Sequence, residues 1–115
     1  MHEFTLAEAL LRATLEVAKA HGNPSVEKVR VRWGRMRQVV PDLLAFAFQA
    51  LAQGTPAEGA TLEWEEEPIQ VRCRQCQAVF EAEDWFWACP RCSAPGGEVL
   101  AGDEFLLESV VLRNT

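Results

Sequence analysis

Four cysteines arranged in two pairs constrain this chain more than any other feature. Cys73 and Cys76 are separated by two residues, twelve residues follow, and Cys89 and Cys92 repeat the same spacing. Two intervening residues let one tight turn present both sulfurs to a single ion, and two such turns on adjacent hairpins form the tetrahedral thiolate cage that zinc favours. Because protein sulfurs fill all four positions, the sequence predicts one structural zinc ion per chain and no open catalytic position.

The segment that carries the cysteines, residues 71–97, is too short to bury enough apolar surface to fold without help. Zinc binding to such a module is worth on the order of 10 kcal/mol, so the ion and the fold should form together. An iron ion in a rubredoxin-like cage and two independent redox pairs remain open alternatives. The aromatic run from Trp85 to Trp87 is interpreted as packing of this module, with a partner-binding patch as the alternative.

Hydrophobic periodicity predicts a helix near the N-terminus. Thr5 and Glu8 have the spacing of a capping box with Thr5 as the N-cap, and apolar residues recur behind them at helical spacing. The helix should run over residues 5–21. His21 is interpreted as a capping residue at the negative helix end, and Gly22 can adopt the left-handed conformation that terminates it.

A second, strongly apolar helix should begin at Pro41 and end before Gly54, and we expect it to lie in the core. Alternating or apolar runs predict strands around residues 28–33, 61–65, 99–100 and 105–112. These elements indicate an α+β fold in which two helices pack on one face of a small, about three-stranded β-sheet with an inserted four-cysteine zinc-ribbon module. Residues 1–70 and 98–115 would form the main domain, and residues 71–97 the zinc-binding insert.

The charge balance argues against nucleic acid as a partner. Acidic residues outnumber basic ones 17 to 11, which gives a net charge of −6, whereas binding to nucleic acid depends on neutralising phosphates. One basic cluster is interpreted as the solvent face of a strand, with a docking surface for an acidic partner as the alternative. It consists of Lys28, Arg30, Arg32, Arg35 and Arg37.

The sequence also points away from membranes and catalysis. No apolar run reaches the roughly 20 residues that span a bilayer, and the first residues lack the features of a secretory signal. We therefore expect a cytoplasmic protein whose cysteines are reduced thiols or metal ligands. His2 and His21 are the only histidines, and no Ser/His/Asp, paired-carboxylate or phosphate-binding glycine arrangement is present, so the sequence argues against an enzyme.

The N-terminus is the second candidate metal site. His2 stands beside the chain's own amino group on Met1. The α-amine, the backbone nitrogen of His2 and its imidazole can close small fused chelate rings on one ion, and such nitrogen-rich sets suit Ni(II) or Cu(II) better than zinc. The amide of Glu3 could complete the plane, while its carboxylate would accept from His2 or stay in solvent. On this signal alone, a frayed terminus is the simpler interpretation.

Several short motifs occur in a specific joint order over essentially the whole chain, and with them the sequence resembles the HypA/HybF hydrogenase nickel-incorporation proteins. The motifs are Met1-His2-Glu3, Gly34, Val40-Pro41, Leu44-Ala45-Phe46-Ala47-Phe48, Gly54-Thr55, Glu58-Gly59-Ala60, Leu62, two CxxC pairs and Gly102-Asp103-Glu104-Phe105-Leu106-Leu107. Two departures are the threonine at Thr5, where serine is common, and the absence of histidine beside the cysteines. The second departure puts ligand exchange at the zinc site in doubt.

The resemblance implies a nickel metallochaperone with a structural zinc domain. Its nickel ligand would be His2, with Glu3 contributing to the site or to transfer, and the nickel ion would be a transferable cargo. The implied partners are the nickel-handling GTPase HypB and the large subunit of a [NiFe]-hydrogenase, and some members also serve urease maturation. We expect a monomer or a weak homodimer. The alternatives are a zinc-ribbon protein-interaction module without nickel function and a redox enzyme working through CxxC.

Overall fold

The computed structural model describes residues 2–83 and 87–113, so Met1, Trp85 and Phe86 lie outside the described residues. The chain divides into two compact units, which are described separately. The first comprises residues 1–31, 39–64 and 106–115, and the second comprises residues 32–38 and 65–105. No helix within the described ranges is both long enough and apolar enough to cross a bilayer.

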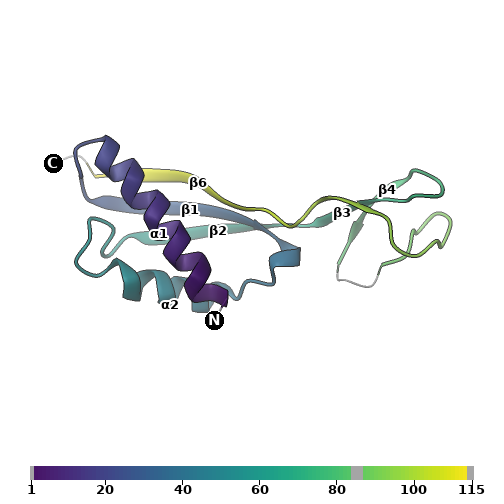
Figure 1. The fold of residues 1–115 in the computed structure, drawn as a ribbon, viewed down its shortest axis with the longest axis horizontal. Helices are drawn as coiled ribbons and strands as arrows, with labels where there is room; N and C mark the ends of the chain where they lie inside the picture. The colour runs from purple at the N-terminus through teal and green to yellow at the C-terminus, as the bar shows by residue number, and fades with distance from the viewer. Residues whose placement is uncertain (1, 84–86, 114–115) are drawn as a thin grey trace. The chain divides into compact units, whose positions relative to one another are not determined.

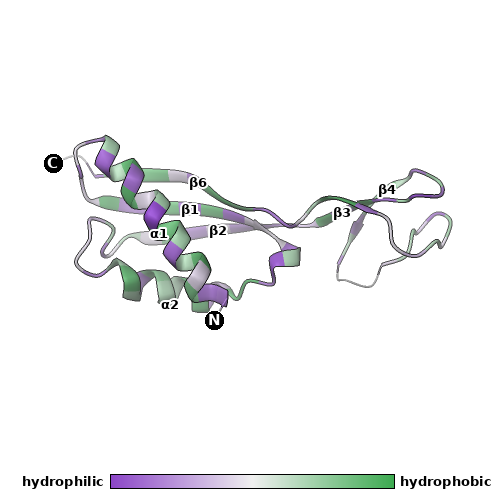
Figure 2. Ribbon diagram, viewed as in Figure 1, coloured by the Kyte–Doolittle hydropathy of each residue, from purple (hydrophilic) through white to green (hydrophobic). Residues whose placement is uncertain are grey.

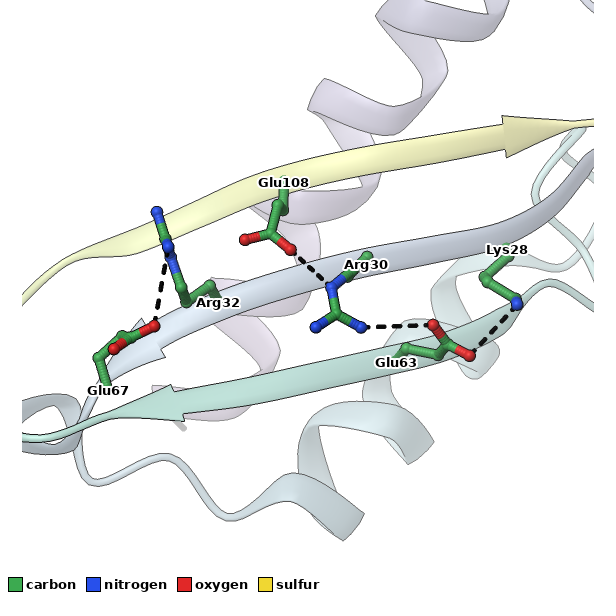
Figure 3. Close-up of polar contacts among 6 residues, drawn as sticks. All are labelled: Lys28, Arg30, Arg32, Glu63, Glu67 and Glu108. Atoms are coloured by element: carbon green, nitrogen blue, oxygen red, sulfur yellow. Dashed lines mark hydrogen bonds and ion pairs between the residues drawn. The ribbon is translucent and has the colours of Figure 1, made fainter.

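The first unit contains two helices on one face of a sheet. The helices are α1 (His2–Ala20) and α2 (Pro41–Ala52), and the sheet has the strand order β2-β1-β6. Figure 1 shows α1 crossing the strands, and Figure 3, which looks at the opposite face, shows both helices behind the sheet. The predicted α+β layer is therefore confirmed, including the return of the last strand to this sheet. The strand bounds are β1 Val26–Gly34, β2 Thr61–Glu67 and β6 Phe105–Leu112.

The core of the first unit forms where the apolar stripes of the helices meet the inner face of β1. Val29 and Val31 of β1 are fully buried, as their alternation with basic residues predicts. From α2, Leu44 and Phe48 are also fully buried. The hydroxyl of Thr14, the buried polar residue of α1, donates to the carbonyl oxygen of Leu10 at 2.8 Å, so it lies in the core at little cost.

Two sequence expectations about the helices are wrong. The first helix begins at His2 rather than at Thr5, so Thr5 lies within the helix and is not its N-cap. The second helix is only half buried, because Leu43 is 50% exposed and Phe46 is 67% exposed. A helix on the surface of a layer packs along one stripe only, so apolar residues outside that stripe remain in solvent.

The end of α1 follows the prediction. The residue after His21 is Gly22, which has a φ of +87°, the left-handed conformation that favours glycine. The N–H of Asn23 donates to the carbonyl oxygen of Ala18 at 2.8 Å, and Nδ1 of His21 lies 2.9 Å from the carbonyl oxygen of Val17. His21 is therefore a capping residue at the C-terminal end of this helix.

The second unit is built on a separate antiparallel sheet with the order β4-β3-β5. Its core consists of Ile69, Val71 and Ala82, against which Phe80 and Trp87 pack. The unit is longer than residues 71–97 because β5 pairs with β3 and belongs to this sheet. The strand bounds are β3 Ile69–Arg72, β4 Val79–Ala82 and β5 Glu98–Ala101.

In the second unit the backbones of Gly34 and Gly102 lie so close together that a side chain on Gly34 would not fit. A Cβ atom on Gly34 would overlap the carbonyl group of Gly102. Beside this contact, the N–H of Gly34 donates to the carbonyl oxygen of Glu104 at 2.8 Å, and the N–H of Met36 donates to that of Gly102 at 2.8 Å. Met36 belongs to the short 3₁₀ helix Arg35–Arg37 and packs against the core of this unit.

Candidate metal centres

The first cysteine turn, residues 73–78, is closed by the backbone. The N–H of Cys73 donates to the carbonyl oxygen of Ala78 at 2.8 Å, and the N–H of Gln77 donates to that of Cys73 at 3.0 Å. Gln77 has a φ of 64°, a left-handed conformation that reverses the chain. The N–H of Cys76 points at the sulfur of Cys73 over 3.5 Å. The turn therefore presents both sulfurs on the same side.

The second cysteine turn, residues 89–94, repeats the first. The N–H of Cys89 donates to the carbonyl oxygen of Ala94 at 2.8 Å, and the N–H of Ser93 donates to that of Cys89 at 2.8 Å. Ser93 takes the same left-handed conformation, with a φ of 65°. The N–H of Arg91 points at the sulfur of Cys89 over 3.4 Å. Two equivalent turns follow from two equal spacings, as the sequence predicts.

The two turns bring all four sulfurs together. The sulfurs of Cys73 and Cys92 are 3.5 Å apart, those of Cys76 and Cys89 are 3.6 Å apart, and all four lie within 4.8 Å of one another. A tetrahedron with Zn–S distances of about 2.3 Å has S···S edges of about 3.8 Å, so the cluster matches the size of a zinc cage. All four cysteines are free of disulfides. The cluster is able to hold a metal ion.

The electrostatics of the cluster also fit a bound dication. The backbone N–H of Cys76 contributes most to lowering the pKa of the Cys73 thiol to about 6. Burial raises the pKa of the Cys89 thiol, but hydrogen bonds from the backbone N–H groups of Cys92 and Arg91 outweigh burial and lower it. At Cys92 the N–H of Ala94 lowers the pKa, yet the neighbouring sulfurs, Cys73 first, raise it to about 12. Four thiolates this close repel one another unless a cation lies between them.

The basic cluster of the sequence lies against carboxylates. Figure 3 shows Lys28 and Arg30 on the face of the sheet opposite the helices. Lys28 is 3.3 Å from Glu63, and Arg30 is 3.6 Å from Glu63 and 2.6 Å from Glu108. Exposed pairs of this kind contribute little to stability, but they cancel the positive potential of the strand. Lys28, Arg30 and Arg32 belong to β1, as the simpler interpretation of a strand face holds, whereas Arg35 and Arg37 lie beyond the strand in the 3₁₀ helix.

Of the remaining basic residues, which belong to the second unit, Arg32 and Arg35 lie against carboxylates, whereas Arg37 contacts a backbone carbonyl group. Arg32 lies 3.7 Å from Glu67, as Figure 3 shows, and Arg35 lies 3.3 Å from Glu66. Nε of Arg37 donates to a backbone carbonyl oxygen at 2.6 Å. An acidic partner of Arg32 or Arg35 would therefore have to displace a carboxylate that already lies beside it.

The N-terminal residues are held at the start of α1. The side chain of His2 is 47% exposed, and its Nδ1 lies 3.6 Å from Oε2 of Glu3, whose side chain is 14% exposed. The same Glu3 oxygen accepts a hydrogen bond from the backbone N–H of Val40 at 3.2 Å. That bond is the main cause of the lowered pKa of Glu3. His2 and Glu3 are therefore brought together, whereas the amine of Met1 lies outside the described residues.

The contact with Val40 is the feature of this site that sequence reasoning missed. Val40 precedes Pro41 and is the N-cap residue of α2, so the first turn of α1 is tied to the start of the second helix. The bond joins residues 37 positions apart, and local patterns do not reveal such contacts. The sequence does mark one end of this contact, because Pro41 after Val40 indicates where α2 begins, but it gives no sign that Glu3 binds there.

Removing the Glu3 carboxylate should loosen this attachment. In Glu3→Ala the Val40 N–H loses its acceptor, and its free energy of opening should fall by about 1 kcal/mol, measured by amide hydrogen exchange. Glu3→Gln retains a carbonyl acceptor and should lose less. Glu8→Ala, at an exposed position of the same helix, is the control. Unchanged exchange of Val40 in Glu3→Ala would show that the hydrogen bond does not hold the terminus.

Comparisons with known proteins agree with this architecture. Residues 1–112 match the family described as HypA, a hydrogenase/urease nickel-incorporation metallochaperone. The chain is 37% identical to hydrogenase maturation factor HypA of Desulfitobacterium hafniense, covering 96% of each chain, and 32% identical to that of Moorella thermoacetica, covering 94% of this chain and 96% of the relative.

Solved structures show the same fold. The solution structure of the Ni metallochaperone HypA from Helicobacter pylori is 24% identical, with a TM-score of 0.69, and 97% of each chain is covered. A second solution structure of a HypA protein is 23% identical, with a TM-score of 0.71, covering 98% of this chain and 97% of the other. At these identities the likeness supports the fold alone.

Proposed function

The chain belongs to the HypA family of nickel metallochaperones, and on this premise we propose that it binds one Ni(II) ion through its N-terminus and delivers it during maturation of a [NiFe]-hydrogenase. The observation that carries the proposal is the position of His2. Its imidazole is about half exposed at the first residue of α1, beside a carboxylate that is anchored to α2. A ligand placed there is accessible to an incoming ion and to a recipient.

The helix start supplies further nitrogen ligands. The first four backbone N–H groups of an α-helix have no partner within the helix, and α1 begins at His2. The amides of His2 and Glu3 are therefore not needed for the helix and could lose their protons to nickel. Together with the α-amine of Met1 and the imidazole, they make a set of four nitrogens, the tetragonal arrangement that suits Ni(II).

The two parts of Glu3 have different tasks in this proposal. Its backbone nitrogen is a nickel ligand, while its carboxylate accepts from Val40 and keeps His2 close to the second helix. The positive end of the α1 dipole opposes a dication, so the affinity should be moderate. Moderate affinity allows the ion to be passed on, which is the task of a carrier.

The zinc ion, in this account, is structural. Cys73, Cys76, Cys89 and Cys92 would hold it with no position left for water, and it would stabilise the second unit without taking part in transfer. The proposed partners are the nickel-handling GTPase HypB and the hydrogenase large subunit in the cytoplasm, with urease maturation factors as a further destination.

A zinc-ribbon interaction module without nickel function is the rival. It would use the basic strand and the aromatic run, but Lys28 and Arg30 of that strand lie beside Glu63, and Trp87 packs against the core of its unit. Neither surface favours the rival over the family's function.

A metal titration tests the proposal. The purified chain should retain about one zinc and bind about one additional nickel per chain at neutral pH, measured by elemental analysis and by competition with a coloured chelator. Zinc content should stay constant as nickel is added. Nickel that binds only by displacing zinc from the cysteines would contradict the proposed N-terminal site.

A further inference from the structure

The two cysteine turns share one backbone conformation but expose their second cysteine differently. Residues 73–80 correspond one by one to residues 89–96, so Cys76 and Cys92 occupy equivalent places. The first cysteine of each pair is buried, with an exposed fraction of 2% or less. Cys76 is half-buried, whereas Cys92 is exposed. Of the four proposed zinc ligands, Cys92 is therefore the most accessible to a small molecule in solution.

One cause of this difference is an aromatic side chain that the second turn lacks. Phe80 of β4 packs against the apolar cluster around the two buried cysteines, as Cys76 does. Gly96 takes the place of Phe80 in the second turn. Apart from its chain neighbours, no atom of the described residues lies within 4 Å of the position that a Cβ of Gly96 would take. Figure 2 shows hydrophobic and hydrophilic residues interspersed along the second unit, so a few side chains decide which ligands are covered.

A second side chain also distinguishes the two turns. Nε2 of Gln77 donates to the carbonyl oxygen of Arg74 at 3.3 Å, so this side chain folds back onto its own turn. The equivalent residue of the second turn is Ser93, which has the same left-handed conformation but a much shorter side chain. Residues 90–93 are all exposed. The second turn is therefore the open side of the cysteine cluster.

We propose that Cys92 is a peroxide-sensitive modification site through which the zinc cage opens. Coordination to a dication deprotonates a thiol, so Cys92 is a thiolate in the zinc-loaded chain. The thiolate is the reactive form of cysteine, and its oxidation follows thiolate character and exposure. Cys92 combines both properties, whereas burial protects its neighbours. The inference rests on the zinc cage proposed above and does not depend on the nickel site.

The chemistry consumes one molecule of hydrogen peroxide for each disulfide. The Cys92 thiolate attacks one peroxide oxygen, the O–O bond breaks and hydroxide leaves, which gives a sulfenic acid. A second thiolate then attacks the sulfenic sulfur and displaces its hydroxyl group as hydroxide. The sulfur of Cys73 lies 3.5 Å from that of Cys92 and is placed for this step. The two sulfurs lose two electrons together, and peroxide is reduced to two hydroxide ions.

The disulfide would join the two turns and consume two of the four ligands. The two remaining sulfurs form an incomplete cage, so zinc should be released and the second unit should lose the stability that zinc supplies. Disulfides are reversible, unlike the higher oxidation states of cysteine. A thiol reductant together with zinc should therefore rebuild the cage. Peroxide would in this way disable the second unit without consuming a nickel ligand.

Zinc release from the zinc-loaded full chain tests the proposal. The chain is treated with a small molar excess of hydrogen peroxide, and a zinc-responsive dye follows the released ion. Dimedone traps sulfenic acids, and peptide mass spectrometry locates the adduct and the disulfide. We expect the first adduct on Cys92, a disulfide between Cys73 and Cys92, and zinc release in step with this disulfide. Dithiothreitol with added zinc should restore about one ion per chain.

Ser93→Gln gives the second turn the side chain that folds back in the first. The φ of Ser93 is 65° and that of Gln77 is 64°, so the replacement fits the backbone. Zinc release should slow at least about threefold, because access to Cys92 is reduced. Ser93→Ala, which removes the hydroxyl group without adding cover, is the matched control and should release zinc as the wild type does. Zinc content and circular dichroism before treatment check that each variant is loaded and folded.

Three results would overturn the proposal. They are zinc that stays bound in peroxide, a first adduct on a cysteine other than Cys92, and a folded Ser93→Gln chain that releases zinc as fast as Ser93→Ala. A chain that purifies without zinc is a different outcome, because it refutes the proposed cage and this inference with it. A chain that holds zinc but does not release it refutes the inference alone.

Discussion

Cys73→Ala is expected to abolish zinc binding and to unfold the second unit. Three thiolates without the buried fourth form an incomplete cage, and zinc contributes on the order of 10 kcal/mol to the folding of small modules of this kind. Cys73 is 1% exposed, and its sulfur is 3.5 Å from that of Cys92. The zinc content measured by elemental analysis should therefore fall from about one ion per chain to almost none.

The matched control for this change is Gln75→Ala. Gln75 is exposed and lies in the same turn, but its side chain is not one of the clustered ligands. The Gln75→Ala variant should retain zinc and the far-ultraviolet circular dichroism spectrum of the unmodified chain. In Cys73→Ala the far-ultraviolet signal of the two helices should persist, because α1 and α2 pack within the first unit. A folded variant that keeps its zinc would refute the four-cysteine assignment.

His2→Ala is expected to remove nickel binding while leaving zinc in place. The change deletes one of the four proposed nitrogens and with it a chelate ring, so nickel affinity should fall by roughly 100-fold or more, or about 2.8 kcal/mol. The side chain of His2 is 47% exposed, so its removal should cost little stability. Isothermal titration with nickel, with zinc quantified in the same sample, measures both effects.

The chain contains its own control for this experiment, since His21 is the only other histidine. It lies at the far end of the same helix and caps the carbonyl oxygen of Val17 at 2.9 Å. His21→Ala should lose a fraction of a kcal/mol of stability and keep full nickel affinity. If both variants bind nickel equally well, neither histidine is the ligand and the proposed site is wrong.

The sequence predicted the clustering of the four cysteines well because its determinants are local. Each turn is specified by two cysteines and the residue that follows them, and the left-handed φ values of Gln77 and Ser93 close both turns in the same way. The β1 alternation was equally informative, since Val29 and Val31 are buried and Arg30 between them lies on the opposite face of the sheet. Local spacing and periodicity suffice for such features.

The errors arose where distant residues decide the structure. The spacing of Thr5 and Glu8 satisfies a capping box, yet α1 begins at His2. Glu3 binds the N–H of Val40, and an acidic residue in the first turn also suits the positive helix end. Phe46 was expected in the core because its helix is apolar on all sides. Only one side of α2, which carries Leu44 and Phe48, is buried, and Phe46 lies outside it.

The extent of the second unit depends on strand pairing. The segment 99–100 was expected to be a strand and is part of β5, which lies beside β3. A four-residue strand can pair with several neighbouring strands, and no local sequence signal specifies which of them it pairs with. The close approach of Gly34 to Gly102, which also joins distant segments, has the same origin.

The central claim is that nickel binds to the terminal amine together with His2. It is tested most directly by extending the chain with Gly-Ser-Gly before Met1, because this moves the amine away from His2 and leaves every side chain intact. A single added residue is unsuitable, since a histidine in the third position can itself close fused rings with the amine and two amides. The same tripeptide added after Thr115 is the control.

Nickel titration of the two extended chains gives the result. The account predicts that the N-terminal extension weakens nickel binding about as much as His2→Ala, whereas the C-terminal extension binds as the unmodified chain does. Equal, undiminished affinity in both extended chains would contradict the account, because the terminal amine would then not be a ligand.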